Sequence, residues 1–306
     1  MSAEEVLIRQ ERESGSASLS GKTKDASRVS YRRFKNRFAH GIFLISTLIG
    51  VVVLALLLAD IFQTGWKWVT PSFFEKFASR LPENAGIKAA FWGSIWVIGV
   101  TTPLTFILGV GTALYLEEYA RKNAFTRFIQ LNISNLAGVP SIVFGILGLT
   151  LFVRTLGLGK SVLAGSLTMT LLILPVVIVA AREAIASVPS SLRQASFAMG
   201  ATRWQTIRKV VLPYSLPGIL TGTILALSRA IGETAPLIMV GAVTFIAYTP
   251  GYVLDSFTVM PIQIYQWISE PKAVFHELAA AGIIVLLALL LTMNAVAIFL
   301  RNKFQR

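Results

Sequence analysis

The sequence contains no cysteine, and this absence excludes disulfide bonds and thiolate metal sites. Histidine is almost as scarce: His40 and His276 both lie at the ends of apolar runs, where we interpret them as interfacial residues rather than metal ligands. The phosphate-binding pattern Gly-x-x-x-x-Gly-Lys-Ser/Thr is missing, so the sequence offers no nucleotide site of that kind. Paired carboxylates within apolar runs and nucleophile–base pairs are missing too, which argues against an enzyme embedded in a membrane.

Charged residues are also scarce, at 14% of the 306 residues, against about 25% in typical soluble domains. Hydrophobic residues make up 54% of the chain, and the mean hydropathy is +0.67. Several charge-free runs reach or nearly reach the roughly 20 residues that a membrane-spanning helix needs. We therefore predict an all-α polytopic membrane protein with six transmembrane helices, at residues of about 41–62, 88–116, 129–153, 161–181, 214–245 and 277–300.

Basic residues near the ends of a span mark the cytoplasmic side of a membrane. Here they are concentrated in the N-terminal tail, after the second and fourth predicted spans, and at the C-terminus. Six helices with both termini cytoplasmic fit this alternation; two separate spans within 210–254 are the competing interpretation, which would place the basic C-terminus outside. The same segments account for most of the net charge of +13. We assign that charge to orientation and to anionic lipid rather than to nucleic acid.

The sequence predicts one membrane domain behind a polar tail. Residues 1–38 are rich in Ser, Lys and Arg, which is typical of a disordered cytoplasmic tail, and no cleavable signal is apparent. Residues 39–306 form the transmembrane domain, which includes a cytoplasmic loop at 182–213. The external segment 246–276 stays open between a re-entrant hairpin and a stretch that lies flat on the outer surface.

The third predicted span opens with small and polar residues, in the run Asn132-Ile-Ser-Asn135-Leu-Ala-Gly138-Val-Pro140-Ser141. Such residues allow close packing of ordinary kinked helices, and they also allow a broken helix that lines a cavity. Both interpretations stay open from the sequence.

An arginine and a glutamate, Arg229 and Glu233, lie four residues apart inside an apolar run, a spacing that places them on one face of a helix. A charge at bilayer mid-depth costs about 2.5–3.5 kcal/mol, so we expect the pair to serve a polar pathway, a proton relay or an ion site. The alternative is a self-neutralising pair that only holds helices together. Gly232 and Pro236 predict a helix break beside it, because proline removes the helical partner of the Gly232 carbonyl. The planar guanidinium suits oxyanions.

The cytoplasmic loop 182–213 predicts two short helices joined by a turn. Pro189 followed by two serines signals a helix start, and Gly200 suits a helix end and turn. Three interpretations compete: a DNA-reading motif, an amphipathic helix on lipid, and a docking helix for a cytoplasmic partner. The first is disfavoured because the loop is tethered at both ends to membrane helices.

This loop resembles the EAA motif of ABC-importer permeases, in which Glu-Ala-Ala, three residues, Gly, nine residues and Ile-x-Leu-Pro follow one another. The spacing matches at Gln194, Ala195, Ser196, Gly200, Leu212 and Pro213. Gln replaces Glu, Ser replaces the second Ala, and Val210 replaces Ile. The resemblance implies that these residues form the helix that couples the chain to an ATPase subunit, although Gln194 cannot make the ion pair of a glutamate.

A second resemblance is to the PstA-type permease family of phosphate-specific ABC importers. It is carried by Ala137-Gly-Val-Pro140-Ser-Ile-Val-Phe-Gly145 and by Arg229-Ala-Ile-Gly-Glu233-Thr-Ala-Pro236-Leu. This resemblance implies an ABC-importer (type I) permease fold with Arg229 and Glu233 on the phosphate pathway. It also implies a second homologous permease, two copies of an ATP-binding subunit and an extracytoplasmic phosphate-binding protein as partners.

Together these observations predict a permease subunit of an ATP-driven phosphate importer in the plasma (inner) membrane. We expect the chain to bind no cofactor, with ATP held by the partner subunits. The alternative function is a secondary, proton- or ion-coupled transporter of an anion, in which Glu233 is the proton site.

Overall fold

The computed structural model describes residues 35–242 and 245–303. The chain divides into two units, with the boundary between Asp60 and Ile61. In the first unit, helical structure begins at Lys35 and belongs to a helix that runs to Trp68. The predicted disordered tail 1–38 therefore needs correction at residues 35–38, which are helical; its residues 1–34 lie outside the described part.

Among the residues that the structure describes, five helices are long and apolar enough to cross a membrane, and a sixth span is reached if one bent pair of helices counts as one. Long apolar helices satisfy their backbone polar groups internally, which is the requirement for crossing lipid. The five helices and the bent pair are Lys35–Trp68, Lys88–Tyr119, Val162–Ala186, Arg203–Ile231, Ala273–Lys303 and the pair Ala124–Leu136 with Ser141–Thr155.

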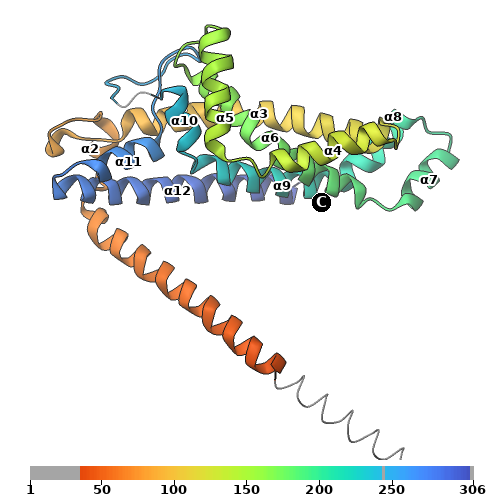
Figure 1. Ribbon diagram of the computed structural model, residues 1–306, viewed down its shortest axis with the longest axis horizontal. Coiled ribbons are helices and arrows are strands. Elements are labelled where there is room, and N and C mark those ends of the chain that lie inside the picture. Colours follow the sequence, from red (N-terminus) through yellow and green to blue (C-terminus); the bar gives the residue numbers. More distant parts are fainter. Residues whose placement is uncertain (1–34, 243–244, 304–306) are drawn as a thin grey trace, which may run out of the picture. The chain divides into compact units, whose positions relative to one another are not determined.

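The second span comprises α3 (Lys88–Leu114) and a final π-helical segment, η3 (Tyr115–Tyr119). It packs along α6 (Val162–Ala186), and these two helices form the centre of the second unit (Figure 1). The helix α9 (Leu212–Ile231) lies against α6 through small residues: a Cβ added at Gly218 would come within 2.8 Å of Ala184 Cβ, and one at Gly222 would overlap Ala180 Cβ. Small residues at this spacing let membrane helices approach closely.

The third span departs from the single helix predicted over 129–153. The structure has α4 (Ala124–Leu136) and α5 (Ser141–Gly148), the latter continued by η4 (Leu149–Thr155), with a bend of 101° between the two parts. Proline lacks an N–H and disfavours helical backbone in the residue before it. Pro140 therefore ends the helical path at this point, and the broken-helix interpretation describes the observed geometry.

The fifth span also departs from the prediction, which ran one helix through 214–245. The helix α9 ends at Ile231, and a short helix, α10 (Ala235–Val240), follows after a break. Pro236 lies in the first turn of α10, where a missing N–H leaves no helical bond unmade. The chain thus restarts at this proline instead of continuing α9.

The two ends of α3 carry different structures (Figure 1). Near one end lie α2 (Pro71–Glu75) and α11 (Met260–Ser269), and α12 (Ala273–Lys303) packs against α11 and α9. The other end carries α7 (Ser190–Ala198) and α8 (Arg203–Thr206), followed by the π-helical segment η5 (Ile207–Val211).

Part of segment 246–276, whose fold the sequence left open, packs over the start of α6. The carbonyls of Val253 and Asp255 accept hydrogen bonds from the backbone N–H groups of Leu163 and Val162, at 2.8 and 2.9 Å. The Ser161 hydroxyl accepts the N–H of Ala164 at 3.2 Å. Three N–H groups that a helix start leaves without partners are satisfied in this way. Segment 246–276 is thus a packed loop followed by α11 and the start of α12.

Candidate substrate pathway and coupling loop

Arg229 and Glu233 form an ion pair at the break between α9 and α10. The Nε of Arg229 donates to Oε1 of Glu233 at 3.2 Å. The arginine side chain is 57% exposed and the glutamate side chain 18% exposed. The expectation that one continuous helix carries both residues is corrected, because α9 ends at Ile231 and Glu233 lies in the connection to α10.

The backbone of this break is held by short-range hydrogen bonds. The N–H of Gly232 donates to the Arg229 carbonyl at 3.2 Å, and the N–H of Glu233 donates to the Ala230 carbonyl at 3.1 Å. Gly232 has a φ of −88°, which any residue can adopt, so its conformation does not require glycine. Pro236, in contrast, is buried in α10.

The break lies at the level of the interior of α3. Ala230 and Ile231 line a cavity of about 20 Å³ together with Val97, Ile98 and Thr101 of α3. Val97 lies nine residues after Lys88, the first residue of α3, or about 14 Å along an axis that rises 1.5 Å per residue. A charge at such a depth is costly against lipid, so Arg229 must face protein or water.

The two broken helices meet at this place. A pocket of about 10 Å³ is lined by Arg229 together with Leu136, Ala137 and Val139 from the bend between α4 and α5. Further along α5, a Cβ added at Gly145 would lie 2.7 Å from Pro236 Cα. Two segments separated by about ninety residues of sequence, the α4–α5 bend and the α9–α10 break, are therefore neighbours in the fold.

The predicted coupling residues lie elsewhere, in α7, its turn and the start of α9. Gln194 and Ala195 are exposed on α7, and the Ser196 hydroxyl is hydrogen-bonded to the Thr206 hydroxyl at 2.9 Å. Gly200 has a φ of +78°, the left-handed conformation that glycine adopts most easily, and it turns the chain toward α8. Leu212 and Pro213 begin α9.

The surface of this loop has a groove and a set of exposed apolar side chains. The groove has a volume of about 560 Å³ and is lined by Leu192, Ala195, Ser196 and Met199, with Gln205 among its polar lining residues. The exposed apolar side chains are those of Leu192, Phe197, Met199 and Trp204. Several large exposed apolar side chains within one short loop, two of them lining a groove, favour a site that docks another protein.

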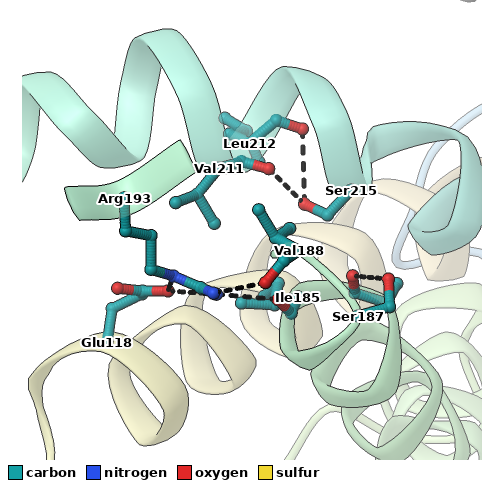
Figure 2. A network of polar contacts seen from close by, with 9 residues as sticks. Glu118, Ile185, Ser187, Val188, Arg193, Val211, Leu212 and Ser215 are labelled. Carbon is teal, nitrogen blue, oxygen red and sulfur yellow. Dashed lines mark hydrogen bonds and ion pairs between the residues drawn. The ribbon is translucent and has the colours of Figure 1, made fainter. Parts of the chain in front are cut away.

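Sequence reasoning missed the residue that fixes α7 in place, Arg193. Its guanidinium donates to the carbonyls of Ile185 and Val188, at 2.9 and 2.5 Å, and to Oε1 of Glu118, at 3.0 Å from Nη2 and 3.2 Å from Nε (Figure 2). The Ile185 carbonyl lies in the last turn of α6, and the Val188 carbonyl lies just after that helix. Carbonyls at a helix end lack the N–H partner that a continuing helix would supply. Arg193 therefore joins α6, α7 and η3 in one network.

Two further contacts of η3 were also missed. Arg182 of α6 donates through Nε to Oε1 of Glu117 at 2.7 Å, and the guanidinium of Arg203 lies 5.1 Å from the ring centroid of Tyr119. The signal was present in the sequence as two adjacent glutamates at the end of a span where basic residues dominate. Their partners depend on the folding of the loop.

Arg229 and Glu233 are thus separated from the predicted coupling residues. Only the coupling residues adjoin the network that Arg193 makes with Glu118 of η3. Within the described residues, no group of three or more His, Asp or Glu side chains is placed to hold a metal ion. The geometry defines a protein with helices long enough to span a membrane, a polar helix break among them and an exposed, grooved loop at one end.

Comparison with known proteins shows which class of transport protein the chain belongs to. The chain belongs to the family of binding-protein-dependent transport system inner membrane components, whose model matches residues 105–306. It is therefore a multi-pass inner-membrane permease subunit of an ABC importer. Such a permease works with a binding protein and with an ATPase that is a separate subunit, so the chain is not itself the enzyme. Membership does not support the alternative of a secondary transporter.

Among its relatives in that family are two that match most of the chain. It is 34% identical over 278 residues to the phosphate transport system permease protein PstA 1 of Mycobacterium tuberculosis (strain CDC 1551 / Oshkosh), covering 88% of this chain and 90% of the relative. It is 30% identical over 289 residues to the phosphate transport system permease protein PstA of Haemophilus influenzae, covering 93% and 99%.

A solved structure shows the same fold. A chain in the crystal structure of a bacterial alginate ABC transporter, in complex with an alginate pentasaccharide-bound periplasmic protein, matches with a TM-score of 0.64 and 15% identity. The match covers 87% of this chain and 95% of that one. At this identity the likeness shows the fold alone, which is that of an ABC-importer permease.

Proposed function

We propose that this chain is the permease subunit of an ATP-driven importer of inorganic phosphate, and that Arg229 and Glu233 lie on the phosphate pathway. The observation that carries the proposal is the exposed guanidinium of Arg229 at a helix break inside the membrane-spanning region. The two relatives described above are phosphate transport system permeases, which supports phosphate as the anion.

The chemistry of the pair suits a transient anion contact. A guanidinium offers planar paired donors to a phosphate oxyanion and offsets part of its desolvation. The single contact between Arg229 and Glu233, at 3.2 Å on a largely exposed arginine, is of the kind worth roughly 0–1 kcal/mol. Phosphate can therefore displace the carboxylate from Arg229, and Glu233 then competes with the anion and promotes its release.

The face that carries Arg229 takes a second, homologous permease. Arg229 is exposed there beside the bent backbone that includes Ala137 and Val139, and Asn132 and Asn135 near the end of α4 are exposed as well. Charges and irregular backbone at membrane depth are tolerated where they face protein or a wet cavity rather than lipid. A partner permease on this face leaves the pathway between the two subunits.

The loop built from α7 and α8 docks an ATPase subunit, of which two copies serve the pair of permeases. Its exposed groove and apolar side chains form the docking surface, with Gln194 as a hydrogen-bonding group in place of a charge. ATP is bound by those subunits, and this chain binds no cofactor of its own. The loop then lies in the cytoplasm with both termini, and a phosphate-binding protein docks on the opposite side.

Uptake of radiolabelled phosphate into vesicles tests this function. The complex of both permeases and the ATPases, supplied with the binding protein, should accumulate phosphate with ATP and not without it. Arg229→Gln should abolish uptake while leaving assembly intact, because the amide keeps hydrogen-bond donors but loses the charge. Arg154→Gln, a change of an exposed arginine in η4, serves as the control and should leave uptake unchanged. Normal uptake by Arg229→Gln would contradict the role of this residue.

A further inference from the structure

The end of the second span, in η3, contacts the end of α6 and both short helices, α7 and α8, of the loop 182–213, which we call the coupling loop. Three consecutive residues of η3 each contact an arginine from a different helix: Glu117 contacts Arg182 of α6 at 2.7 Å, Glu118 contacts Arg193 of α7 at 3.0 Å, and Tyr119 lies 5.1 Å from the guanidinium of Arg203 of α8. We call these three contacts the η3 brace. Neither α3 nor η3 is adjacent to the loop in sequence, so the brace is an attachment made by tertiary structure alone.

The central contact of the brace, the ion pair of Arg193 with Glu118, lies largely out of water and should resist separation. The side chains of Arg193 and Glu118 are 22% and 11% exposed. The guanidinium also donates to the carbonyls of Ile185 and Val188, so carboxylate and carbonyl acceptors surround it (Figure 2). Separating a charge pair that is largely withdrawn from water leaves both charges poorly solvated. The π-helical form of η3, which is frequent at functional sites, places Glu118 in the buried position.

From the brace, α3 leads to the helix break at Arg229. The Thr101 hydroxyl of α3 donates to the Ser166 carbonyl of α6 at 3.2 Å, and the Ser166 hydroxyl donates to the Val97 carbonyl at 3.3 Å. Val97 and Thr101 line the small cavity that Ala230 and Ile231 share, directly beside Arg229. One helix therefore connects the coupling loop with the flank of the break.

We propose that the η3 brace is a second mechanical attachment of the coupling loop, through which α7 and α3 move as one body when ATP binds to the docked ATPases. Glu118 is the positioning residue that holds α7 to α3. The competing route is the covalent one, from α8 through η5 into α9, which reaches Arg229 without α3. The inference rests on the proposed docking of ATPases to the loop, but it does not depend on which solute is carried.

Distances between pairs of spin labels test the proposal directly, because a chain without cysteine gives no background labelling. One pair joins α7 to α3, through Ser191→Cys and Ile107→Cys, and a reference pair joins α7 to α12, through Ser191→Cys and Leu291→Cys; all three residues are exposed. In the complex with its ATPases, ATP should change the reference distance and leave the α7–α3 distance constant.

Removal of the brace should separate the two helices. In a Glu118→Gln background, ATP should change the α7–α3 distance as well, because the amide cannot hold the guanidinium as a carboxylate does. A control change of an exposed carboxylate on α2, Glu75→Gln, should keep the distance constant. The proposal is overturned if the α7–α3 distance changes with the brace intact, if it stays constant in Glu118→Gln, or if the reference distance does not change.

Transport then measures the consequence. Glu118→Gln should reduce the phosphate taken up per ATP hydrolysed by about tenfold, within the usual range of coupling between distant sites, with ATPase binding unchanged. Glu117→Arg should lower the same ratio, and the charge-swapped double variant Glu117→Arg with Arg182→Glu should restore it. If Glu118→Gln leaves the ratio of phosphate taken up to ATP hydrolysed unchanged, the brace is contradicted. If the unaltered complex takes up no phosphate, the proposed phosphate import is contradicted instead, and the label distances still test the brace.

Discussion

Two arginine–glutamate pairs in this chain are built differently. Arg193 and Glu118 come from separate helices and are 22% and 11% exposed. The Arg193 guanidinium also donates to two backbone carbonyls. Arg229 and Glu233 are four residues apart, are 57% and 18% exposed, and share one contact at 3.2 Å. The chemical groups are the same in both pairs, and only their surroundings differ. We call Arg193 with Glu118 the closed pair and Arg229 with Glu233 the open pair.

The difference teaches what each pair is suited to do. A pair withdrawn from water, with its remaining donors satisfied, resists separation because both charges would lose their solvation. A pair whose arginine is largely exposed gains little from its single contact and exchanges partners readily. The first arrangement suits a joint between helices, and the second suits a place where a passing anion replaces the carboxylate.

The largest expected effect comes from truncating the arginine of the closed pair. Arg193→Ala should lower the free energy of unfolding by about 3 kcal/mol, because Glu118 keeps its burial and loses its partner. Arg229→Ala should lower it by less than about 1 kcal/mol. Thermal unfolding of the two purified variants, measured side by side, checks this; equal shifts in Tm would show that the pairs do not differ as described.

The next largest effect concerns the packing that holds the open pair at its break. Gly145→Ala should destabilise the protein by about 2 kcal/mol, as overpacking does, because the new Cβ would lie 2.7 Å from the Pro236 backbone. Gly111→Ala, in α3 where nothing lies within 4 Å of the new Cβ, is the matched control. It should stabilise the helix by up to about 1 kcal/mol. The same Tm measurement decides, and a tolerated Gly145→Ala would contradict the close contact of α5 with α10.

A smaller effect is expected at the turn that shapes the loop of the closed pair. Gly200→Val should cost about 1–2 kcal/mol, because a β-branched residue is strained at a φ of +78°. The strain should appear locally, as faster proteolysis of the loop and weaker copurification of the ATPase. Gly200→Asn should have a milder effect, since asparagine tolerates this conformation better. Unchanged copurification with Gly200→Val would argue against docking through this turn.

The smallest effect on stability is expected at the acid of the open pair. Glu233→Gln should change the free energy of unfolding by less than about 0.5 kcal/mol, because the contact it weakens is an exposed one. Its effect should appear in transport: without the competing carboxylate, phosphate binds Arg229 more tightly and leaves more slowly, so KM and kcat should both fall. Uptake measured against phosphate concentration distinguishes this from a rise in KM, which would contradict competition between Glu233 and the anion.

The sequence predicted the straight spans well and the broken ones poorly. The span predicted at 88–116 is found as Lys88–Tyr119, and that at 161–181 as Val162–Ala186. Length and apolarity are enough for such helices, because each one satisfies its own backbone. The spans at 129–153 and 214–245 are interrupted beside Pro140 and Pro236. Proline indicated a disturbance at both places, but whether a helix kinks or ends depends on what packs against it.

The site divides in the same way. Arg229 and Glu233 stood out because charges are rare in apolar runs, and Gly200 because a turn was needed there. Arg193 did not stand out, since a basic residue in a cytoplasmic loop is ordinary. Its importance appears only when Glu118, seventy-five residues earlier, is seen beside it.

By itself, then, the order of residues determined that this chain is helical, crosses a membrane and keeps a charged pair within an apolar run, because these properties follow from local composition and from the poor solubility of peptide groups in lipid. The tertiary structure decided which of two similar ion pairs is closed and which is open. It did so by bringing α3 to the loop and the α4–α5 bend to the break, and the exposure that results sets the strength of each pair.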